Sequence, residues 1–236
     1  MLTQTTIRHD SIHPALKSAR SVAPTSARVV IAGTEPLAET MRLMGAVMSH
    51  SRNSEIFGQS ESADYLYKVM GGCVRTYKTL NDGRRQISGF YLPGEVFGLG
   101  YDDEHTVSAE AIADSKVLVI TRSAVNALAG HDPAIARELF TVVARELRRA
   151  QDRVLLLIKS AQERVAGFLL EMADRMSAND AVELPMSRQD IADYLGLTIE
   201  TVSRTLTALE CSAVIELLTS RQIVLRNRAA LSRMVG

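Results

Sequence analysis

The sequence has no tryptophan, only two cysteines and no apolar run long enough to cross a membrane. Its longest strictly aliphatic run, Val154 to Ile158, falls far short of the roughly 20 residues that span a bilayer. The amino-terminal stretch has no continuous apolar segment behind its charged residues, so it does not resemble a secretory signal. We therefore expect a cytoplasmic protein that has no membrane partner.

The scarcity of cysteine limits redox and metal chemistry. Cys73 and Cys211 fit a reducing compartment, and together they cannot supply the full thiolate ligand set of an iron–sulfur cluster. We expect each cysteine to be a small packed apolar residue rather than a reactive thiol.

Neither positive nor negative charge is in excess. The 27 Lys and Arg residues balance 27 Asp and Glu residues, so the net charge gives no reason to expect binding to nucleic acid or to an acidic ligand. Residues 160–236 hold 8 Arg and no Lys against 10 acidic residues, a net charge of −2. Only the stretch from Leu218 onward is basic, with four arginines and no acidic residue. Any binding to DNA must therefore depend on a few well-placed groups.

The patterning divides the chain into segments. Residues 1–34 are expected to form a flexible extension, and a weak helical pattern covers Leu37 to Met48. Residues 35–130 contain short β-rich runs, and Asp82-Gly83 between two alternating runs predicts a β-hairpin. We predict an α+β protein that begins with an antiparallel β-barrel or sandwich.

A long helix is predicted within residues 131–159, because no glycine or proline occurs between Pro133 and Gly167. Apolar residues recur there at alternating spacings of three and four, as in a coiled-coil seam. One apolar stripe could merely cover the chain's own barrel. Further apolar residues favour a parallel homodimer, since they could face the barrel while the seam faces a second subunit; they are Leu139, Val142, Leu156 and Ile158. The predicted dimerisation residues are Phe140, Val143, Leu147, Ala150, Val154, Leu157 and Ala161.

Residues 160–236 have the pattern of a winged helix-turn-helix. Ser187 with Asp190 three residues later resembles a capping box that starts a short helix. Gly196 stands where the chain must turn, since glycine adopts a left-handed backbone at low cost. Thr198 is a good N-cap for a second helix. The apolar face of that second helix is predicted to consist of Val202, Leu206 and Leu209.

The opposite face of the second helix is polar and suits the major groove of DNA. Arg204 can donate to guanine, Glu200 can accept from cytosine, and Ser203 can serve several bases. Two apolar runs around Arg221 predict a β-hairpin wing. An ordinary amphipathic helical hairpin would also have a polar outer face. The winged helix-turn-helix is favoured because a predicted β-hairpin with an arginine at its tip follows the two helices. The predicted contacts to the DNA backbone are Ser187, Arg188, Gln189, Thr198, Thr201 and Arg221.

The order of β-barrel, long helix and winged helix-turn-helix, with the stretch "LPMSRQDIADYLGLTIETVSR", resembles the Crp/Fnr family of transcription regulators, specifically its Fnr and FixK branch. The resemblance implies a cyclic-nucleotide-binding-like barrel and a homodimer on palindromic double-stranded DNA, with RNA polymerase as a partner. In that branch, residues at the positions of Glu200, Ser203 and Arg204 read a TTGAT half-site of an inverted repeat. The resemblance alone implies control of low-oxygen respiration or nitrogen-fixation genes.

The expected barrel lacks the groups that bind effectors elsewhere in this family. Leu99 stands where the cyclic-AMP-binding branch has a glutamate, and no arginine occurs between Arg85 and Arg122 to hold a cyclic phosphate. The iron–sulfur branch has clustered cysteines near its amino terminus, whereas no cysteine precedes Cys73. His105 is a poor candidate for a haem ligand, because its acidic neighbours predict an exposed loop residue. We expect no cofactor.

An enzyme is not expected either. A catalytic metal site needs His or carboxylate ligands that converge from separate elements, whereas His105 and its acidic neighbours are consecutive in one loop. The Gly71-Gly72 pair lacks the lysine of a phosphate-binding loop. We expect an effector-independent transcription regulator, an activator rather than a repressor. The alternative is an effector-binding sensor or protein-interaction module of the same fold with little specific DNA readout.

Overall fold

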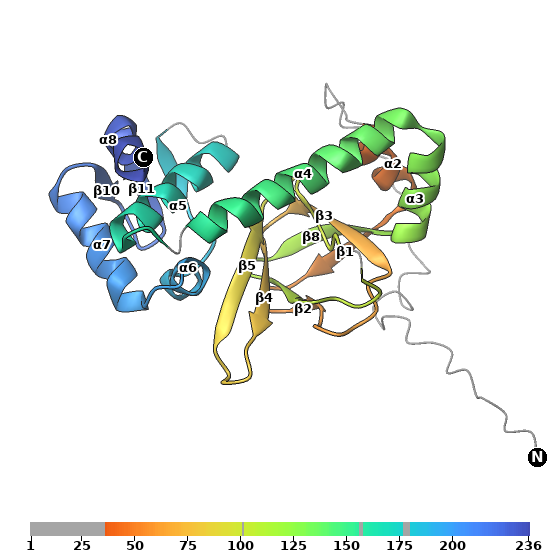
Figure 1. Ribbon diagram of the computed structural model, residues 1–236, viewed down its shortest axis with the longest axis horizontal. Helices are drawn as coiled ribbons and strands as arrows, with labels where there is room; N and C mark the ends of the chain where they lie inside the picture. Colours follow the sequence, from red (N-terminus) through yellow and green to blue (C-terminus); the bar gives the residue numbers. More distant parts are fainter. Residues whose placement is uncertain (1–35, 101, 156–157, 177–179) are drawn as a thin grey trace, which may run out of the picture.

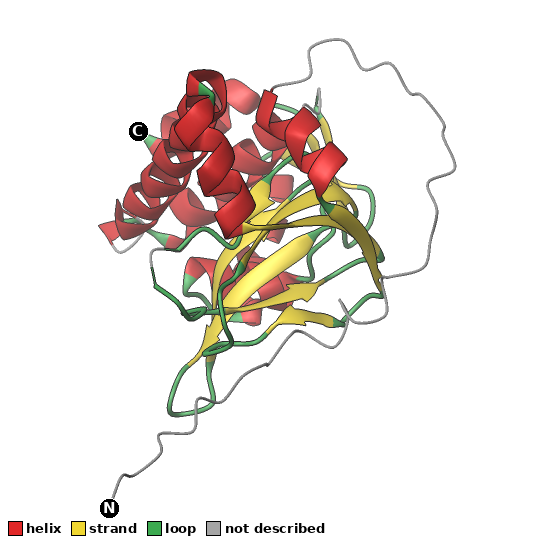
Figure 2. Ribbon diagram, turned by 90° about the vertical axis from the view of Figure 1, so that its right-hand side faces the viewer, coloured by secondary structure: helices red, strands yellow, loops and turns green. Residues whose placement is uncertain are grey.

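The structure is a computed structural model that describes residues 36–100, 102–155, 158–176 and 180–236. The extension expected at residues 1–34 lies outside these ranges. Figure 1 shows a β domain, the long helix α4 (Pro133–Leu155) running across it, and a helical domain beyond the carboxyl end of α4. In Figure 2 most of the helices lie beside the upper part of the strands, and further helical turns are visible behind the strands. Within the described ranges, no helix combines the length and apolar character needed to span a membrane.

The β domain consists of two four-stranded antiparallel sheets that enclose a shared apolar core. The first sheet has the order β1 (Ala46–His50), β8 (Ser115–Thr121), β3 (Tyr65–Gly71) and β6 (Val96–Phe97). The second has the order β2 (Glu55–Phe57), β7 (Ser108–Ala111), β4 (Val74–Thr79) and β5 (Arg85–Tyr91). The predicted antiparallel architecture is confirmed. Among the described residues no ladder of strand pairs joins the two sheets, so the domain is a sandwich and not a closed barrel.

The β4–β5 hairpin is confirmed where the Asp82-Gly83 pair predicts it. The two strands pair antiparallel from Val74 opposite Tyr91 to Thr79 opposite Arg85. Gly83 has a φ of 81°, a conformation that glycine adopts without strain. The Asp82 carboxylate accepts a hydrogen bond from the Arg84 amide at 3.0 Å, which closes the turn. Local sequence thus determines this hairpin.

The segment before the first sheet contains a helix and then a strand. Helix α2 (Pro36–Met44) occupies the first part of the predicted helical pattern, but the continuation of that pattern to Met48 is wrong, because these residues form β1. A Cβ atom on Gly45 would lie 2.6 Å from the Met41 carbonyl oxygen and 2.8 Å from that of Val119. The chain therefore has no room for a side chain at Gly45, and from Ala46 onward it pairs antiparallel with β8.

Two helices follow the β domain. Helix α3 (Arg122–His131), which the sequence did not predict, begins after Thr121, whose hydroxyl accepts a hydrogen bond from a helix amide. Helix α4 follows it, and its residues Leu139 and Val142 pack against the buried cluster between α2, α3 and the first sheet, as predicted. These contacts hold α4 against the β domain.

The apolar residues beyond α4 behave differently from the prediction. Leu156 and Leu157 lie outside the described residues. Ile158 is 85% exposed, so the expectation that it faces the β domain is wrong. Helix α4 is described to Leu155, and Ile158 lies in a 3-10 turn beyond it, where the residue spacing of an α-helix no longer applies.

The carboxyl-terminal domain combines helices with a three-stranded sheet. Its elements are α5 (Ala161–Arg175), β9 (Ala181–Glu183), α6 (Arg188–Leu195), α7 (Ile199–Cys211), β10 (Ile215–Leu217), β11 (Gln222–Leu225) and α8 (Arg228–Val235). The predicted β10–β11 hairpin is confirmed. Strand β9, which pairs with β11, and helix α8 were not predicted. One buried cluster contains Ile87 and Phe90 of the β domain together with Phe168 and Tyr194, so the two domains share a core.

Candidate nucleic-acid interface

The turn between α6 and α7 is stabilised by caps that the sequence predicts. The Ser187 hydroxyl accepts a hydrogen bond from the Asp190 amide at 3.1 Å, and the Asp190 carboxylate accepts one from the Ser187 amide at 2.9 Å. The capping box is thus confirmed. Gly196, with a φ of 65°, ends α6 in the left-handed conformation, and the Thr198 hydroxyl caps α7 by accepting from the Thr201 amide at 3.2 Å. These bonds set the start of both helices.

Helix α7 has one buried and one polar face. Its apolar residues Val202, Leu206 and Leu209 are buried, as predicted. On the opposite side Glu200 and Arg204 are exposed. Since neither side chain is needed in the protein core, both are available to a ligand in the solvent. The polar face as a whole consists of Glu200, Ser203, Arg204 and Thr207.

Glu200 is held in its ionised form. Hydrogen bonds from its own backbone amide and from the Thr198 side chain, with a further contribution from the charge of Arg204, keep the pKa of Glu200 below its ordinary value. An ionised carboxylate can only accept hydrogen bonds. Among the bases this suits the amino group of cytosine, the base that Glu200 is predicted to read.

The first helix contacts a residue of the second helix's polar face. Arg188 Nη1 donates a hydrogen bond to the Ser203 hydroxyl at 3.2 Å. Both side chains are half-buried, whereas their neighbour Arg204 is exposed. Arg188, which is predicted to contact phosphate, therefore lies directly beside Ser203, which is predicted to read bases.

The other predicted backbone contacts lie at the helix starts and on the wing. The Ser187 hydroxyl donates to the Asp190 carboxylate at 2.7 Å, and the Gln189 side-chain amide donates to Asp193 at 2.6 Å. The hydroxyls of Thr198 and Thr201 lie 3.1 Å apart at the amino end of α7. The contacts of these residues with DNA stay predictions.

The wing is tied to the segment that precedes α6. Strands β10 and β11 pair antiparallel, and the turn between them carries the half-buried Arg221 beside the exposed Thr219 and Ser220. The Arg221 carbonyl oxygen accepts a hydrogen bond from the Leu184 amide at 2.8 Å. This bond and the β9–β11 pairing place the wing beside the entry to the helix-turn-helix.

Helix α4 exposes most of the seam predicted for dimerisation. Phe140 is 72% exposed, Leu147 59% and Val154 63%. Val143 and Ala150 are also exposed, and Ala161 is half-buried at the start of α5, while Leu157 lies outside the described residues. One apolar side of α4 packs on the β domain, and the described residues leave the apolar stripe on its other side uncovered.

The β domain contains a small cavity with a histidine in its wall. The cavity of about 160 Å³ is lined by Phe57, Phe97, Leu99, His105 and Arg122, among others. Arg122 donates to the carbonyl oxygens of Gly98 at 2.7 Å and Asp102 at 3.1 Å. The described residues contain no cluster of His, Cys, Asp or Glu side chains arranged to hold a metal.

The expectation that His105 is an exposed loop residue is wrong. Its ring is buried and stacks on Phe57 with the ring centroids 3.6 Å apart. Backbone hydrogen bonds from the His105 amide to Glu61 and from the Ser60 amide to His105 fasten the loop to a second loop, which turns the ring inward. Burial, followed by the charge of Arg122, lowers the pKa of His105 to about 4.

The two cysteines differ. Cys73 is buried, as predicted, and burial raises its thiol pKa to about 12. Cys211 is exposed, so the expectation that it is a packed residue is wrong. It lies in the last turn of α7 and falls outside the stripe formed by Val202, Leu206 and Leu209.

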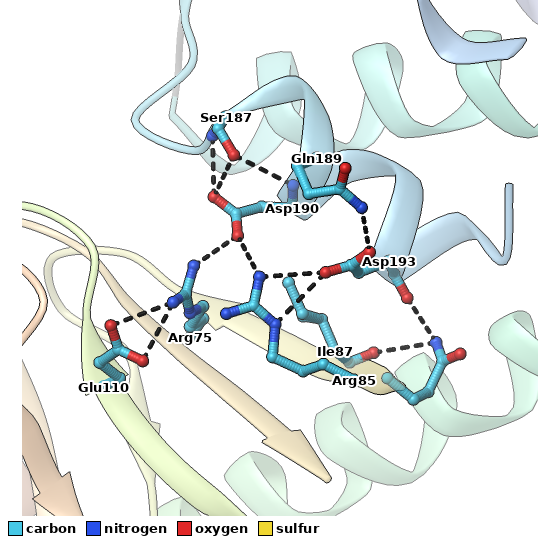
Figure 3. Close-up of polar contacts among 9 residues, drawn as sticks. Arg75, Arg85, Ile87, Glu110, Ser187, Gln189, Asp190 and Asp193 are labelled. Carbon is cyan, nitrogen blue, oxygen red and sulfur yellow. Dashed lines mark hydrogen bonds and ion pairs between the residues drawn. The ribbon is translucent and has the colours of Figure 1, made fainter. Parts of the chain in front are cut away.

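An ion-pair cluster that the sequence did not predict joins α6 to the β domain (Figure 3). Asp190 Oδ1 accepts hydrogen bonds from Arg75 on β4 and from Arg85 on β5, the latter at 3.1 Å. Arg75 also binds both carboxylate oxygens of Glu110 at 3.0 Å, and Arg85 binds Asp193 at 3.0 Å. The available signal was Arg75, a charged residue near the start of β4, but its partner lies 115 residues away.

Comparison with known proteins gives the family. Residues 163–234 match the Crp-like helix-turn-helix domain, and residues 47–132 match the cyclic nucleotide-binding domain. The nitrogen fixation regulation protein FixK of Azorhizobium caulinodans is 47% identical over 203 residues, which cover 84% of this chain and 82% of that protein. This chain belongs to the Crp/Fnr family of transcription regulators. The predicted family is thus confirmed, and it is not a family of enzymes.

Further Crp/Fnr relatives place the chain with regulators of the FixK type. The solved structure of FixK2 from Bradyrhizobium japonicum is 48% identical, and it matches with a TM-score of 0.79 over 82% of this chain and 98% of that one. The transcriptional activatory protein AadR of Rhodopseudomonas palustris is 44% identical over 160 residues, 66% of this chain and 67% of that protein. The predicted order of β domain, long helix and winged helix-turn-helix is confirmed by this likeness.

Proposed function

We propose that this chain is a transcriptional activator that binds a TTGAT-type inverted repeat as a homodimer. The observation that carries the proposal is the polar face of α7, where Glu200, Ser203 and Arg204 lie together opposite a fully buried face. Arg204 would donate to guanine, the ionised Glu200 would accept from cytosine, and Ser203 would contact an adjacent base.

The homodimer is proposed from the exposed apolar stripe of α4. Two copies of α4 packed in parallel would cover the stripe from Phe140 to Val154, and the seam would continue through Leu157 to Ala161. Such a dimer has two-fold symmetry, which matches the symmetry of an inverted repeat. In this arrangement residues 35–130 form the sensor-like domain, residues 131–159 the dimerisation segment and residues 160–236 the DNA-binding domain.

Affinity for the DNA backbone would come from a small set of groups, because the DNA-binding segment has a net charge of −2. Phosphate contacts fix the position of the protein on the duplex, whereas base contacts provide specificity. Symmetry would double every contact in the dimer. The proposed backbone contacts are Ser187, Arg188, Gln189, Thr198, Thr201 and Arg221.

The gene targets are proposed from the relatives. FixK of Azorhizobium caulinodans is named as a regulator of nitrogen fixation, and AadR is named as an activatory protein. We propose that this chain likewise activates nitrogen-fixation or low-oxygen respiration genes in the cytoplasm, with RNA polymerase as its partner.

We also propose that no cyclic nucleotide, iron–sulfur cluster or haem is needed for DNA binding. The cavity of the β domain presents Leu99 and the stacked, buried His105 on its wall. The Arg122 guanidinium there donates to the carbonyl oxygens of Asp102 and Gly98, which hold it against the loop that precedes His105. Titration calorimetry with cyclic AMP and absorbance titration with hemin test this point, and tight binding of either would contradict it.

The main test is a fluorescence-anisotropy titration of the purified full-length chain. One labelled duplex contains a TTGAT inverted repeat, and the second has the same base composition in scrambled order. Specific DNA-binding proteins commonly prefer their site by about 10³-fold or more over other sequences at physiological salt. Equal affinity for the two duplexes would reject specific readout and favour a sensor or protein-interaction role.

A further inference from the structure

The first helix of the helix-turn-helix is fastened to the β domain by side chains of opposite charge. Asp190 uses Oδ2 to cap α6 through Ser187, and uses Oδ1 to bind Arg75 and Arg85 (Figure 3). The Gln86 side-chain amide also donates to the Asp193 carbonyl oxygen at 2.7 Å. One carboxylate therefore orders the start of α6 and attaches this helix to another domain.

The charges in this cluster depend on one another because they are shielded from water. The side chains of Arg75 and Asp190 are 10% and 6% exposed, and those of Arg85 and Asp193 are 28% and 15% exposed. Removing Arg75 would leave the carboxylates of Asp190 and Glu110 near each other without their shared cation. Buried, unpaired charges are strongly unfavourable. Separation of the domains, which hydrates both carboxylates, would then be favoured.

Two further contacts tie the domains together at the same interface. Phe90 of β5 packs against Tyr194 of α6, with ring centroids 5.2 Å apart. Beyond them, Glu95 binds Arg175 of α5 at 2.7 Å and also Arg149 of α4. The helix-turn-helix is therefore fixed relative to both the β domain and α4.

The docked arrangement leaves the DNA-reading surface open. Helix α6 lies against β5, and α7 lies on the far side of α6 from the β domain (Figure 1). Glu200 and Arg204 are exposed in this arrangement, so the contact with the β domain does not cover them. Docking thus orients the helix-turn-helix without blocking it.

We propose that Arg75 and Arg85 are positioning residues for DNA binding, which hold each helix-turn-helix in the orientation that an inverted repeat requires. The inference rests on the proposed function, and it supplies a reason why the chain needs no effector. Every group of the cluster belongs to the chain itself, so the orientation is available before any ligand binds. Apparent affinity equals the intrinsic affinity multiplied by the fraction of molecules in the competent arrangement.

The first experiment measures the orientation without DNA. Cys211 is exposed, whereas Cys73 is buried with a thiol pKa of about 12, so a spin label reacts selectively with Cys211. Arg52→Cys adds a second label on an exposed turn of the β domain. The labelled chain is diluted with an excess of unlabelled chain so that pulsed electron paramagnetic resonance reports distances within one subunit. We expect a narrow distance distribution for the otherwise unchanged chain.

The variants then test the cluster. The double variant Arg75→Gln with Arg85→Gln should broaden the distribution. Arg84→Gln, on the same hairpin but at a residue that pairs with the exposed Asp82 of its own turn, should leave it narrow. If the competent fraction of each subunit falls to about one-tenth, affinity for the inverted repeat falls about tenfold to a hundredfold, depending on whether one or both subunits must be oriented. An unchanged distribution, or a tighter complex with DNA, would overturn the proposal.

Exchanging the charges of Arg85 and Asp193 distinguishes a positioning role of the cluster from a general loss of folding. Arg85→Glu and Asp193→Arg should each weaken binding to the repeat. The double variant should recover part of the affinity, because its pair with residue 193 is restored in reverse while a glutamate at position 85 still repels Asp190. Failure of the double variant to recover, in a chain with normal circular dichroism, would contradict the proposal. If the unchanged chain does not distinguish the repeat from scrambled DNA, the proposed function fails, while the distance measurements still decide the role of the cluster.

Discussion

Arg188 donates a hydrogen bond to Ser203, and this contact of 3.2 Å links the start of α6 to the polar face of α7. An arginine at the first position of one helix thereby restrains a hydroxyl on the next. Ser203 is consequently half-buried, whereas Arg204 beside it is free to extend into solvent. Among the proposed base readers, Arg204 is thus the residue whose removal should affect specificity without disturbing the fold.

Replacing Arg204 with alanine should weaken binding to the TTGAT repeat by about 1–3 kcal/mol, because a bidentate contact to guanine is lost. Binding to the scrambled duplex should change little. Anisotropy titrations on both duplexes measure the difference. Arg52→Ala, at an exposed turn of the β domain, is the matched control and should bind like the unchanged chain. An equal loss on both duplexes would show that Arg204 contacts phosphate instead.

Replacing Arg221 with alanine should weaken binding to both duplexes. The residue lies on the turn of the wing, and a phosphate contact there would carry no sequence information. The slope of log affinity against log salt should become shallower by about 1 for each contact removed. Titrations at several salt concentrations give the slope, and an unchanged slope would remove Arg221 from the set of phosphate contacts.

Replacing Leu147 with glutamate should separate the proposed dimer. Leu147 is 59% exposed in the single chain and lies in the middle of the α4 seam. A charge buried without a partner between two helices is strongly unfavourable. Sedimentation velocity should show a monomer, and affinity for the inverted repeat should fall with it. Thr141→Glu, at an exposed α4 position outside the seam, should remain dimeric.

His105 should make the stability of the β domain depend on pH. Its pKa is lowered to about 4 in the folded chain, from an ordinary value of 6.5. Between these values the unfolded chain binds more protons than the folded one, so the free energy of unfolding falls as the pH falls from 6.5 toward 4. Urea unfolding at several pH values measures this slope. His105→Phe keeps an aromatic ring against Phe57 but cannot titrate, and it should flatten the slope; an equally steep slope in this variant would assign the effect to other groups.

Features that depend on near neighbours were predictable. The Ser187–Asp190 cap, the turn at Gly196, the Thr198 cap and the hairpin at Asp82-Gly83 each involve residues that are close in sequence. Their conformations follow from backbone preferences and short-range hydrogen bonds. The amphipathic period of α7 was equally informative, since burial of one helical face follows from the spacing of its apolar residues.

Features that depend on distant partners were not predictable in the same way. Acidic neighbours suggested that His105 is exposed, but pairing with a second loop buries it. A helical pattern continued past Met44, but pairing with β8 makes the residues from Ala46 to His50 a strand. In both cases tertiary contacts outweighed the local preference.

The amino-acid sequence by itself determined the helix-turn-helix, the two faces of α7 and the apolar stripe of α4, because periodicity and capping act over a few residues. Only the tertiary structure decided what Arg75 and Arg85 do. Their partner Asp190 lies 115 and 105 residues away, and no local rule pairs a strand residue with a helix in another domain. That pairing exists because the shared apolar core brings α6 against β5. A charge shielded from water at this interface is unfavourable unless an opposite charge pairs with it.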